Sequence, residues 1–401
     1  MSLIEKIRSR DARCGVIGLG YVGLPLAVEL AQAGYHAIGF DVIPEKVERV
    51  NAGDSYVKDV SNEALAAVVK SGRLKATSDF SLLRDCDTVD ICVPTPLRKT
   101  RDPDISYIVS AVEEIAKYKH PGMLVVLEST TYPGTTEEVI LPMLQDENFR
   151  VGEQFHLAFS PERVDPGNPR FNTKNIPKVV GGMTPGCTEI AAALYSASLT
   201  TVVPVSNARV AETVKLLENT FRSVNIGLVN EMALMCNKMD IDVWEVIRAA
   251  ATKPFGFMPF YPGPGLGGHC IPIDPFYLSW KAKLAGFEAR FIELAGQING
   301  SMPEYVVTRV MEALNTRKRS LNGSRVLVMG VSYKANIDDV RESPAIDVMR
   351  LLRRHGADVV YHDRWANPHD HELVEAGVAS IGFTPKEIAG CDCAVIVTGH
   401  T

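Results

Sequence analysis

The chain has 401 residues, of which 46% are hydrophobic and 22% charged, and its formal net charge is −6. The length suffices for two or three domains, and the composition is typical of a soluble globular protein. The acidic balance gives no reason to expect nucleic acid or an anionic membrane as the partner, and no apolar run approaches the roughly 18 to 20 residues that a membrane span needs.

The N-terminus and the cysteines predict the cellular location. The first residues contain no hydrophobic region of a signal peptide. The eight cysteines are scattered, and the one close pair, Cys391 and Cys393, lacks the spacing of zinc ligands. Free thiols without a disulfide framework favour the cytoplasm, and we expect no metal site.

A nucleotide-binding pattern opens the chain. The strand-like run Arg13–Ile17 is followed by the sequence G-L-G-Y-V-G at Gly18–Gly23, then by helical periodicity, and a second strand, His36–Phe40, ends at Asp41. Strand, G-x-G-x-x-G, helix and a following acidic residue together predict a dinucleotide-binding unit.

Each residue of this pattern has a physical role. Gly18 would permit the tight turn, Gly20 the approach of a pyrophosphate, and Gly23 the close packing of helix on strand. The N-terminus of the helix would face the phosphates. Asp41 would bind the ribose hydroxyls and favour NAD over NADP, a preference that Lys46 nearby tempers.

Three further strand-like runs end in polar turns: Thr88–Val93, Met123–Leu127 and Phe155–Phe159. Open parallel sheets bind ligands at the carboxyl ends of their strands, so we expect Thr95, Thr130 and Glu162 at the active edge. An ordinary turn is an equal alternative for the two threonines, because Ser, Thr and Pro favour turns, whereas an acidic residue at that edge favours function.

The residues Ser206–Lys238 predict one helix about 45 Å long, with Ser206 or Asn207 as its N-cap. A helix of this length would bridge two domains and offer a surface to a partner subunit, so we expect a homodimer or a dimer-based oligomer. Lys215 and Asn219 share one face of it, where a solvated polar stripe is the alternative interpretation. A shorter helix, Val243–Ala251, follows.

The prolines and glycines of Pro259–Cys270 exclude a helix or a central strand, so this stretch predicts a loop of fixed shape. The loop delivers Cys270, with Asp274 four positions later. A thiol beside a carboxylate suggests a nucleophile with an acid–base partner, and a buried structural cysteine is the equal alternative.

A second strand–loop–helix–strand pattern lies near the C-terminus, after a helical segment around Phe287–Leu314. It consists of Arg325–Met329, a loop, a helix Ala345–His355, and a strand Asp358–His362 that ends at Asp363. This copy lacks G-x-G-x-x-G, so its ligand phosphates would rely on the cations Lys334 and Arg341. A doubly wound domain ordinarily continues beyond the last strand, Cys391–Val397, so we expect this domain to be incomplete.

Six motifs occur in the order of a known family: GVIGLGYVGLPLA, ESTTYPGTT, SPERVDPGN, VKLLENTFRSVNIGLVNE, GPGLGGHCIPIDPFYL and GVSYKANIDDVRESPA. On these motifs the chain resembles the UDP-glucose/GDP-mannose dehydrogenase family of nucleotide-sugar 6-dehydrogenases, nearly end to end. The form GGHCIPIDPFYLSWKAK is similar to the UDP-N-acetylhexosamine branch, especially the UDP-N-acetylglucosamine 6-dehydrogenases. The UDP-glucose enzymes typically carry Lys where this chain has Ile273.

The resemblance implies an α/β fold with two Rossmann-like doubly wound domains, joined by a long central helix and a helical middle domain. We expect an NAD-binding domain over residues 1–205, a central helical domain over 206–315 and a nucleotide-sugar-binding domain over 316–401. The reaction it implies is the four-electron oxidation of the sugar C6 hydroxyl to a carboxylate with two NAD.

The resemblance also implies roles for individual residues. Asp274, with a water near Thr130, would take the hydroxyl proton, and Cys270 would trap the aldehyde as a thiohemiacetal that becomes a thioester. Lys215 and Asn219 would stabilise the oxyanion, and Glu162 would steer the hydrolytic water. The cofactor-binding candidates are Gly18, Gly20, Tyr21, Val22, Gly23, Asp41, Lys46, Thr95, Thr130 and Arg341. The substrate-binding candidates are Glu162, Lys215, Asn219, Tyr261, Gly267 and Lys334.

Alternatives remain at the level of substrate and class. The same chemistry could act on UDP-glucose, UDP-N-acetylmannosamine or GDP-mannose. A two-electron dehydrogenase of the β-hydroxyacid type would need no thiol, and a non-catalytic nucleotide-sugar-binding protein would have no use for Lys215, Asn219, Cys270 and Asp274 together. His269 beside Cys270 is expected to be a satisfied or a substrate-contacting histidine and not half of a Cys–His pair, because adjacent residues of an extended loop point apart.

Overall fold

The computed structural model describes residues 1–96, 103–164, 168, 170–268 and 271–401. The chain forms two compact units, Met1–Leu217 and Glu218–Thr401. Helix α8, Ala208–Lys238, begins in the first unit and continues in the second. Among the described residues, no helix combines the length and the apolar character that crossing a membrane requires.

The first unit is built on an eight-stranded sheet with the order β3-β2-β1-β4-β5-β6-β7-β8. The strands are β1 Arg13–Ile17, β2 His36–Phe40, β3 Leu74–Thr77, β4 Thr88–Ile91, β5 Leu124–Leu127, β6 His156–Phe159, β7 Lys178–Gly182 and β8 Val202–Pro204. Neighbouring strands run parallel except β6 and β7, which are antiparallel. Every residue of β4 and β5 is buried, as expected for parallel strands covered on both faces.

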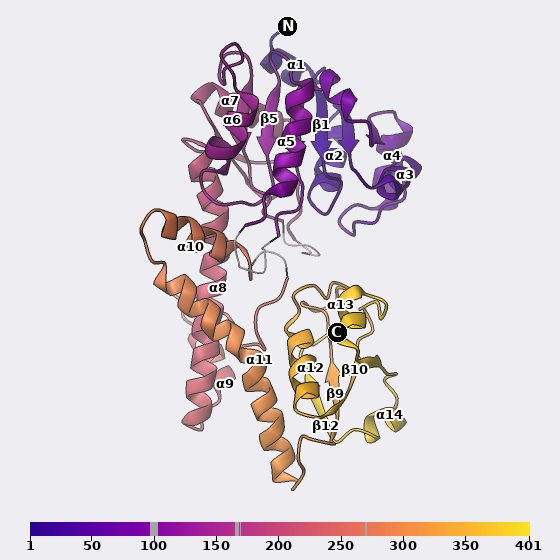
Figure 1. Cartoon of the computed structure of the whole chain (residues 1–401), viewed down its shortest axis with the longest axis vertical. Helices are drawn as coiled ribbons and strands as arrows, with labels where there is room; N and C mark the ends of the chain where they lie inside the picture. Colours follow the sequence, from indigo (N-terminus) through magenta and orange to yellow (C-terminus); the bar gives the residue numbers. More distant parts are fainter. Residues whose placement is uncertain (97–102, 165–167, 169, 269–270) are drawn as a thin grey trace. The chain divides into compact units, whose positions relative to one another are not determined.

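Helices cover both faces of this sheet (Figure 1). They are α1 Leu3–Ser9, α2 Gly23–Gln32, α3 Pro44–Ala52, α4 Asn62–Lys70, α5 Ser106–Tyr118, α6 Leu141–Leu144 and α7 Pro185–Ser196, with the short turns η1 Phe80–Asp85 and η2 Thr136–Ile140. Two separate cores result. Leu124 and Val126 of β5 pack into the core with α2 and α7, whereas Val125 and Leu127 pack into the core with α5. The alternation of β5 thus places the sheet between two helical layers.

The second unit continues α8 with more helices and a smaller sheet. The helices are α9 Val243–Ala250, α10 Asp274–Leu284, α11 Arg290–Thr316, α12 Pro344–Arg354, α13 His371–Ala376 and α14 Pro385–Ala389. The strands β9 Arg325–Met329, β10 Asp358–His362, β11 Ala379–Ser380 and β12 Cys393–Ile396 form a parallel sheet in the order β11-β10-β9-β12. Val310 of α11 and Met349 of α12 share one core with Val328 of β9, so α11 anchors this sheet.

The predicted fold class is confirmed: two parallel α/β sheets and a helical segment with a long helix. Helix α8 starts at Ala208, and the Oδ1 atom of Asn207 accepts the N–H of Val210 at 3.0 Å, so Asn207 is the N-cap. Helix α10 was not predicted. Asp274 is its first residue and Pro275 follows at a position where a helix has no need of the missing N–H.

Candidate active site

The glycine-rich turn after β1 has the shape that a dinucleotide needs. Gly18 has a φ of +91°, and a Cβ atom at Gly23 would lie 1.9 Å from the carbonyl oxygen of Gly18, so a side chain at Gly23 would collide with backbone. A Cβ at Gly20 would meet nothing within 4 Å, which leaves open space beside the turn. Helix α2 starts here without a side-chain cap at Val22, so its first N–H groups suit a phosphate.

Asp41 fixes this turn to the end of β2. One carboxylate oxygen accepts the N–H of Leu19 at 2.9 Å and the other accepts the N–H of Ile43 at 3.0 Å. The ammonium of Lys46 lies 3.5 Å from the first oxygen. Asp41 is 6% exposed, and Tyr21 on the turn is 52% exposed. A carboxylate has about four acceptor positions, so these contacts leave capacity for ribose hydroxyls, and the residues fit NAD.

The turns after β4 and β5 are tied together. The hydroxyl of Ser129 donates to the carbonyl oxygen of Val93 at 2.7 Å. The neighbouring candidates Thr95 and Thr130 are both half-buried in these turns. Both threonines therefore lie at the carboxyl ends of parallel strands, the edge where such sheets bind ligands.

Glu162 follows β6 and is held on both carboxylate oxygens. Oε1 accepts the N–H groups of Arg163 at 2.7 Å and Val164 at 2.8 Å, and Oε2 lies 3.4 Å from the ammonium of Lys178. Burial alone would raise the pKa of Glu162, but Lys178, the two backbone N–H groups and Lys215 outweigh it and lower that pKa. Glu162 is therefore a carboxylate at neutral pH, suited to accept a hydrogen bond.

Lys215 and Asn219 on α8 are buried, with exposures of 7% and 5%. The alternative of a solvated polar stripe is therefore wrong. The side-chain N–H of Asn219 donates to Oδ2 of Asp274 at 2.5 Å, and Asp274 is 2% exposed. Buried polar side chains need hydrogen-bond partners because water does not reach them. Here the amide of Asn219 fixes the orientation of the Asp274 carboxylate.

The proline- and glycine-rich loop packs against the loop after β9 within the second unit. A Cβ at Gly267 would lie 2.7 Å from Tyr333 and 3.1 Å from the carbonyl oxygen of Glu342. The candidates Lys334 and Arg341 directly adjoin these two contacts. The guanidinium of Arg341 pairs with Asp339 at 2.8 Å.

The remaining candidates of this loop are Tyr261 and the residues around Cys270. Tyr261 is 52% exposed and stacks on Trp244, with ring centroids 6.2 Å apart. His269 and Cys270 lie outside the described residues.

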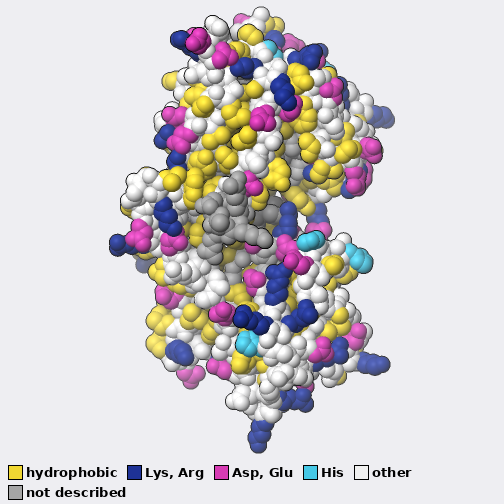
Figure 2. Space-filling view, in the orientation of Figure 1, with side chains coloured by type: hydrophobic (Ala, Val, Ile, Leu, Met, Phe, Trp, Pro, Cys, Tyr) yellow, Lys and Arg dark blue, Asp and Glu magenta, His cyan; other side chains and the backbone are white. Residues whose placement is uncertain are grey.

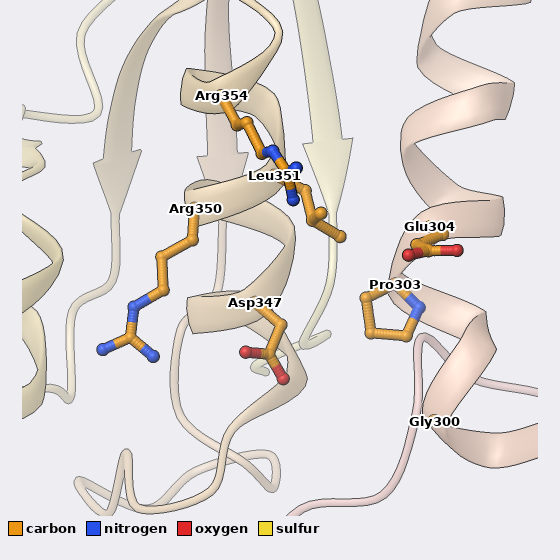
Figure 3. A pocket seen from close by; sticks show the side chains of 7 residues that line it. All are labelled: Gly300, Pro303, Glu304, Asp347, Arg350, Leu351 and Arg354. Carbon is orange, nitrogen blue, oxygen red and sulfur yellow. The ribbon is translucent and has the colours of Figure 1, made fainter. Parts of the chain in front are cut away.

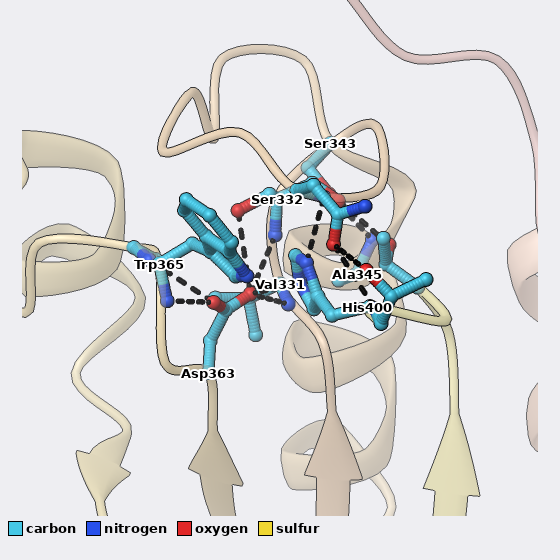
Figure 4. Close-up of polar contacts among 11 residues, drawn as sticks. Val331, Ser332, Ser343, Ala345, Asp363, Trp365 and His400 are labelled. Carbon is cyan, nitrogen blue, oxygen red and sulfur yellow. Dashed lines mark hydrogen bonds and ion pairs between the residues drawn. The ribbon is translucent and has the colours of Figure 1, made fainter.

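Asp363 in the second unit has the same role as Asp41 in the first: its carboxylate follows a strand and accepts backbone N–H groups of the neighbouring loop. It accepts the N–H groups of Val331 at 2.7 Å and Trp365 at 2.7 Å, and it pairs with His400 at 2.9 Å (Figure 4). Burial would raise the pKa of Asp363, but the N–H groups of Ala366, Val331, Trp365 and Ser332 lower it to about 2. The acidic residue after β10 therefore closes the loop after β9.

A shallow cavity of about 270 Å³ lies between α11 and α12 (Figure 3). Arg350 and Arg354 on α12 and Asp347 and Glu304 contribute two charges of each sign. None of the predicted site residues lines it. The balanced charges give this cavity no preference for an anion.

Sequence reasoning missed Glu128 and Lys178. Lys178 is the first residue of β7, a strand whose every residue is buried, and its ammonium pairs with the carboxylate of Glu128. A lysine directly before the apolar run Val179-Val180 was the one signal in the sequence. Among the described residues, no group of His, Cys, Asp and Glu could hold a metal ion.

Comparisons with known proteins agree with this architecture. The NAD-binding domain of the UDP-glucose/GDP-mannose dehydrogenase family matches residues 12–199, its central domain matches residues 209–301, and its UDP-binding domain matches residues 327–401. The chain therefore belongs to the UDP-glucose/GDP-mannose dehydrogenase family, and its cofactor is NAD.

Individual relatives span nearly the whole chain. The UDP-N-acetyl-D-glucosamine 6-dehydrogenase of Pseudomonas aeruginosa is 36% identical over 98% of this chain and 91% of its own length. A solved UDP-N-acetylmannosamine dehydrogenase from Pyrococcus horikoshii has a TM-score of 0.87 and 33% identity, covering 97% of this chain and 89% of its own. A solved NDP-N-acetyl-D-galactosaminuronic acid dehydrogenase from Methanosarcina mazei has a TM-score of 0.84 and 33% identity, covering 100% and 89%.

Proposed function

We propose that this protein oxidises the C6 hydroxyl of a UDP-N-acetylhexosamine, UDP-N-acetyl-D-glucosamine above all, to the uronate with two NAD. The observation that carries the proposal is the buried pair of Asn219 and Asp274, with Lys215 one helical turn from Asn219 on α8. A protein that only bound nucleotide sugars would have no use for Lys215, Asn219, Cys270 and Asp274 together, and burying such polar groups costs free energy.

The chemistry divides the residues by step. Asp274, oriented by Asn219, takes the hydroxyl proton together with a water near Thr130, and NAD, when bound, would supply the hydride acceptor. The thiol of Cys270 adds to the aldehyde as a thiohemiacetal, and the second oxidation leaves a thioester. Lys215 and Asn219 donate hydrogen bonds to the oxyanion of each tetrahedral adduct, a role worth about 3 to 4 kcal/mol of barrier per donor.

The relatives named above support an N-acetylated sugar, because the names of all three contain an N-acetylated amino sugar. UDP-glucose, UDP-N-acetylmannosamine and GDP-mannose are the alternative substrates for the same chemistry. The UDP-binding domain matched at residues 327–401 fits a uridine nucleotide. A non-catalytic nucleotide-sugar-binding protein is the alternative from another class.

The division into domains is part of the proposal: residues 1–205 bind NAD, 206–315 carry the catalytic loop, and 316–401 bind the nucleotide sugar, with Lys334 and Arg341 as its cations. The seven cysteines among the described residues are free thiols, which favours the cytoplasm.

We also propose a homodimer formed through the central helices. Figure 2 shows hydrophobic side chains at the surface that α8 and α9 form. Exposed large apolar residues of α8, of the turn after it and of α9 include Leu217, Phe221, Leu228, Met235, Met239 and Trp244. An apolar surface of this kind is typical of an interface, and light scattering at micromolar concentration tests it, because a monomer would contradict the dimer.

The experiment that tests the function counts NADH formed per nucleotide sugar consumed, with UDP-N-acetylglucosamine, UDP-N-acetylmannosamine, UDP-glucose and GDP-mannose side by side. Two NADH with one N-acetylated sugar would support both the reaction and the substrate class. One NADH with an aldehyde product would contradict the covalent step at Cys270. Binding of a UDP-sugar without NADH from any of the four would favour the non-catalytic alternative.

A further inference from the structure

Four buried polar side chains of the first unit line up behind Glu162. Lys178 is 4% exposed, and its ammonium contacts Glu128 on one side and Glu162, at 3.4 Å, on the other. The hydroxyl of Tyr195 lies 2.5 Å from Oε1 of Glu128 and 2.6 Å from Oδ1 of Asp90. A network of contacting side chains thus runs from the sheet interior to the active edge: Asp90, Tyr195, Glu128, Lys178 and Glu162.

Burying this network of charged and polar side chains costs too much free energy for it to be incidental packing. Asp90 is 0% exposed and Glu128 is 1% exposed, and buried charges are stable only when they are paired and hydrogen-bonded. Lys178 also lies over the ring of Tyr195, 5.3 Å from its centroid. Lys178 is the one cation within this network and contacts Glu128 and Glu162, so the interior end, at Asp90, is left without an ion-pair partner in the network.

The contacts also require a proton within this network. The Tyr195 hydroxyl has one hydrogen and faces two carboxyl oxygens, so one of them has to be protonated for both contacts to be hydrogen bonds. Glu128 is neutralised by Lys178, whereas no cation among the described residues forms an ion pair with Asp90. Burial, together with the charge of Glu128, raises the pKa of Asp90 to about 7. Asp90 then donates to Tyr195, Tyr195 to Glu128, and Lys178 to both glutamates.

A few neighbouring groups influence the charge of Glu162. Among the residues that the structure describes, Lys178 of β7 and Lys215 of α8 are cations that act on it, Glu128 after β5 is an acidic neighbour, and Cys92 after β4 is a buried thiol. The guanidinium of Arg163 donates instead to the carbonyl oxygen of Pro177 at 2.6 Å. Lys178 is the one of these that contacts the Oε2 oxygen.

We propose that Lys178, held in place by Glu128, Tyr195 and Asp90, is a positioning residue that keeps Glu162 an oriented carboxylate for the hydrolytic half of the reaction. This inference rests on the proposed function. In that step the water oxygen bonds to the thioester carbon and the carbon–sulfur bond breaks. One water proton goes to the Cys270 sulfur, and the other is released as the product carboxyl group ionises. Glu162 accepts a hydrogen bond from the attacking water and orients it.

The first experiment reads the charge of Glu162 without using activity. The full chain is labelled with ¹³C at the glutamate carboxyl carbons, and Glu162→Gln identifies the signal of Glu162 in an NMR titration. Lys178→Met combined with Glu128→Gln removes the buried ion pair as a unit, so neither partner is left as an unpaired charge. We expect the pKa of Glu162 to rise by about one unit or more in this double variant, because an adjacent opposite charge shifts a carboxyl pKa by about 1 to 3 units.

Two variants serve as references. Lys178→Arg keeps the positive charge and should leave the pKa of Glu162 low. Lys117→Met removes an exposed lysine that pairs with Glu114 on α5, and it should change nothing at Glu162. An unchanged pKa of Glu162 in the Lys178→Met/Glu128→Gln chain that still binds NAD would overturn the proposal.

The second experiment asks whether Lys178 acts through Glu162. Decay of the thioester is followed by rapid quench and mass spectrometry over a range of pH. In the Lys178→Met/Glu128→Gln variant we expect slower hydrolysis and an acid limb that moves to higher pH by the same amount as the pKa of Glu162. On a Glu162→Gln background the same double replacement should cost little more.

The outcomes separate this inference from the proposed function. Additive losses, or slower hydrolysis with an unmoved acid limb, would assign Lys178 a merely structural role and overturn the inference. If the wild-type chain formed no thioester from any nucleotide sugar, the proposed function would fail and the hydrolytic role of Lys178 with it. The NMR titration would still decide whether Lys178 controls the charge of Glu162.

Discussion

Replacing Asp363 by Asn tests how the C-terminal sheet holds its loops. The side chain of Asp363 is fully buried and accepts backbone N–H groups from two loops, including those of Ser332 and Trp365. Its pKa falls from 3.8 to about 2, and this difference at about 1.36 kcal/mol per unit makes its charge worth about 2 kcal/mol. Because the folded-state pKa is the lower one, this stability is complete well above pH 4 and is lost as the pH falls through 2.

We therefore expect Asp363→Asn to lower the free energy of unfolding by at least about 2 kcal/mol at pH 7, since the new amide N–H₂ also faces backbone donors. At pH 3 about half of the difference from wild type should remain. Urea unfolding is followed by the fluorescence of Trp365 in a Trp244→Phe/Trp280→Phe background. Asp358→Asn is the control, because Asp358 is 62% exposed and its pair with Arg325 contributes little. A pH-independent difference would refute the reasoning.

Three shorter predictions concern the candidate site. Gly23→Ala should lower stability by about 1 to 3 kcal/mol in thermal melts, because its Cβ meets the backbone of Gly18, whereas Gly20→Ala should melt like wild type and weaken NAD binding in a titration. Asn219→Ala should slow NADH formation about 100-fold without loss of NAD affinity, and a normal rate would contradict an oxyanion role. Cys270→Ser should stall before the second NADH in a burst assay, so steady release of two NADH would exclude the covalent step.

Local sequence patterns were sufficient to predict most of the fold. The strands β1, β2, β9 and β10 have the bounds that their apolar runs predicted, because a buried parallel strand is a continuous apolar run between turn residues. Helix α10 escaped prediction because prolines and glycines dominate the stretch before it, and its own sequence, with Pro275 at the start, has little amphipathic pattern.

The candidate site could be predicted fully from the sequence only where residues of one local segment form it. Gly18, Gly20, Gly23 and Asp41 could be read from the sequence because the turn that they form is local. The position of Glu162 at the end of a strand could also be predicted, but its ionisation and the partners that hold it could not. They depend on Lys178, which follows it by 16 residues, and on Tyr195, which lies 67 positions from Glu128 and 105 from Asp90.

The sequence by itself determined the alternation of strands and helices, the dinucleotide turn and the order of the motifs, because backbone preferences and hydrophobic period act between neighbours along the chain. The tertiary structure alone decided which polar groups are buried together. Burial turns Lys215 and Asn219 from surface residues of a helix into buried polar groups, and it makes Lys178 the cation of a carboxylate cluster. The reason is physical: the free energy of a charge depends on its surroundings in space, and distant segments supply those surroundings.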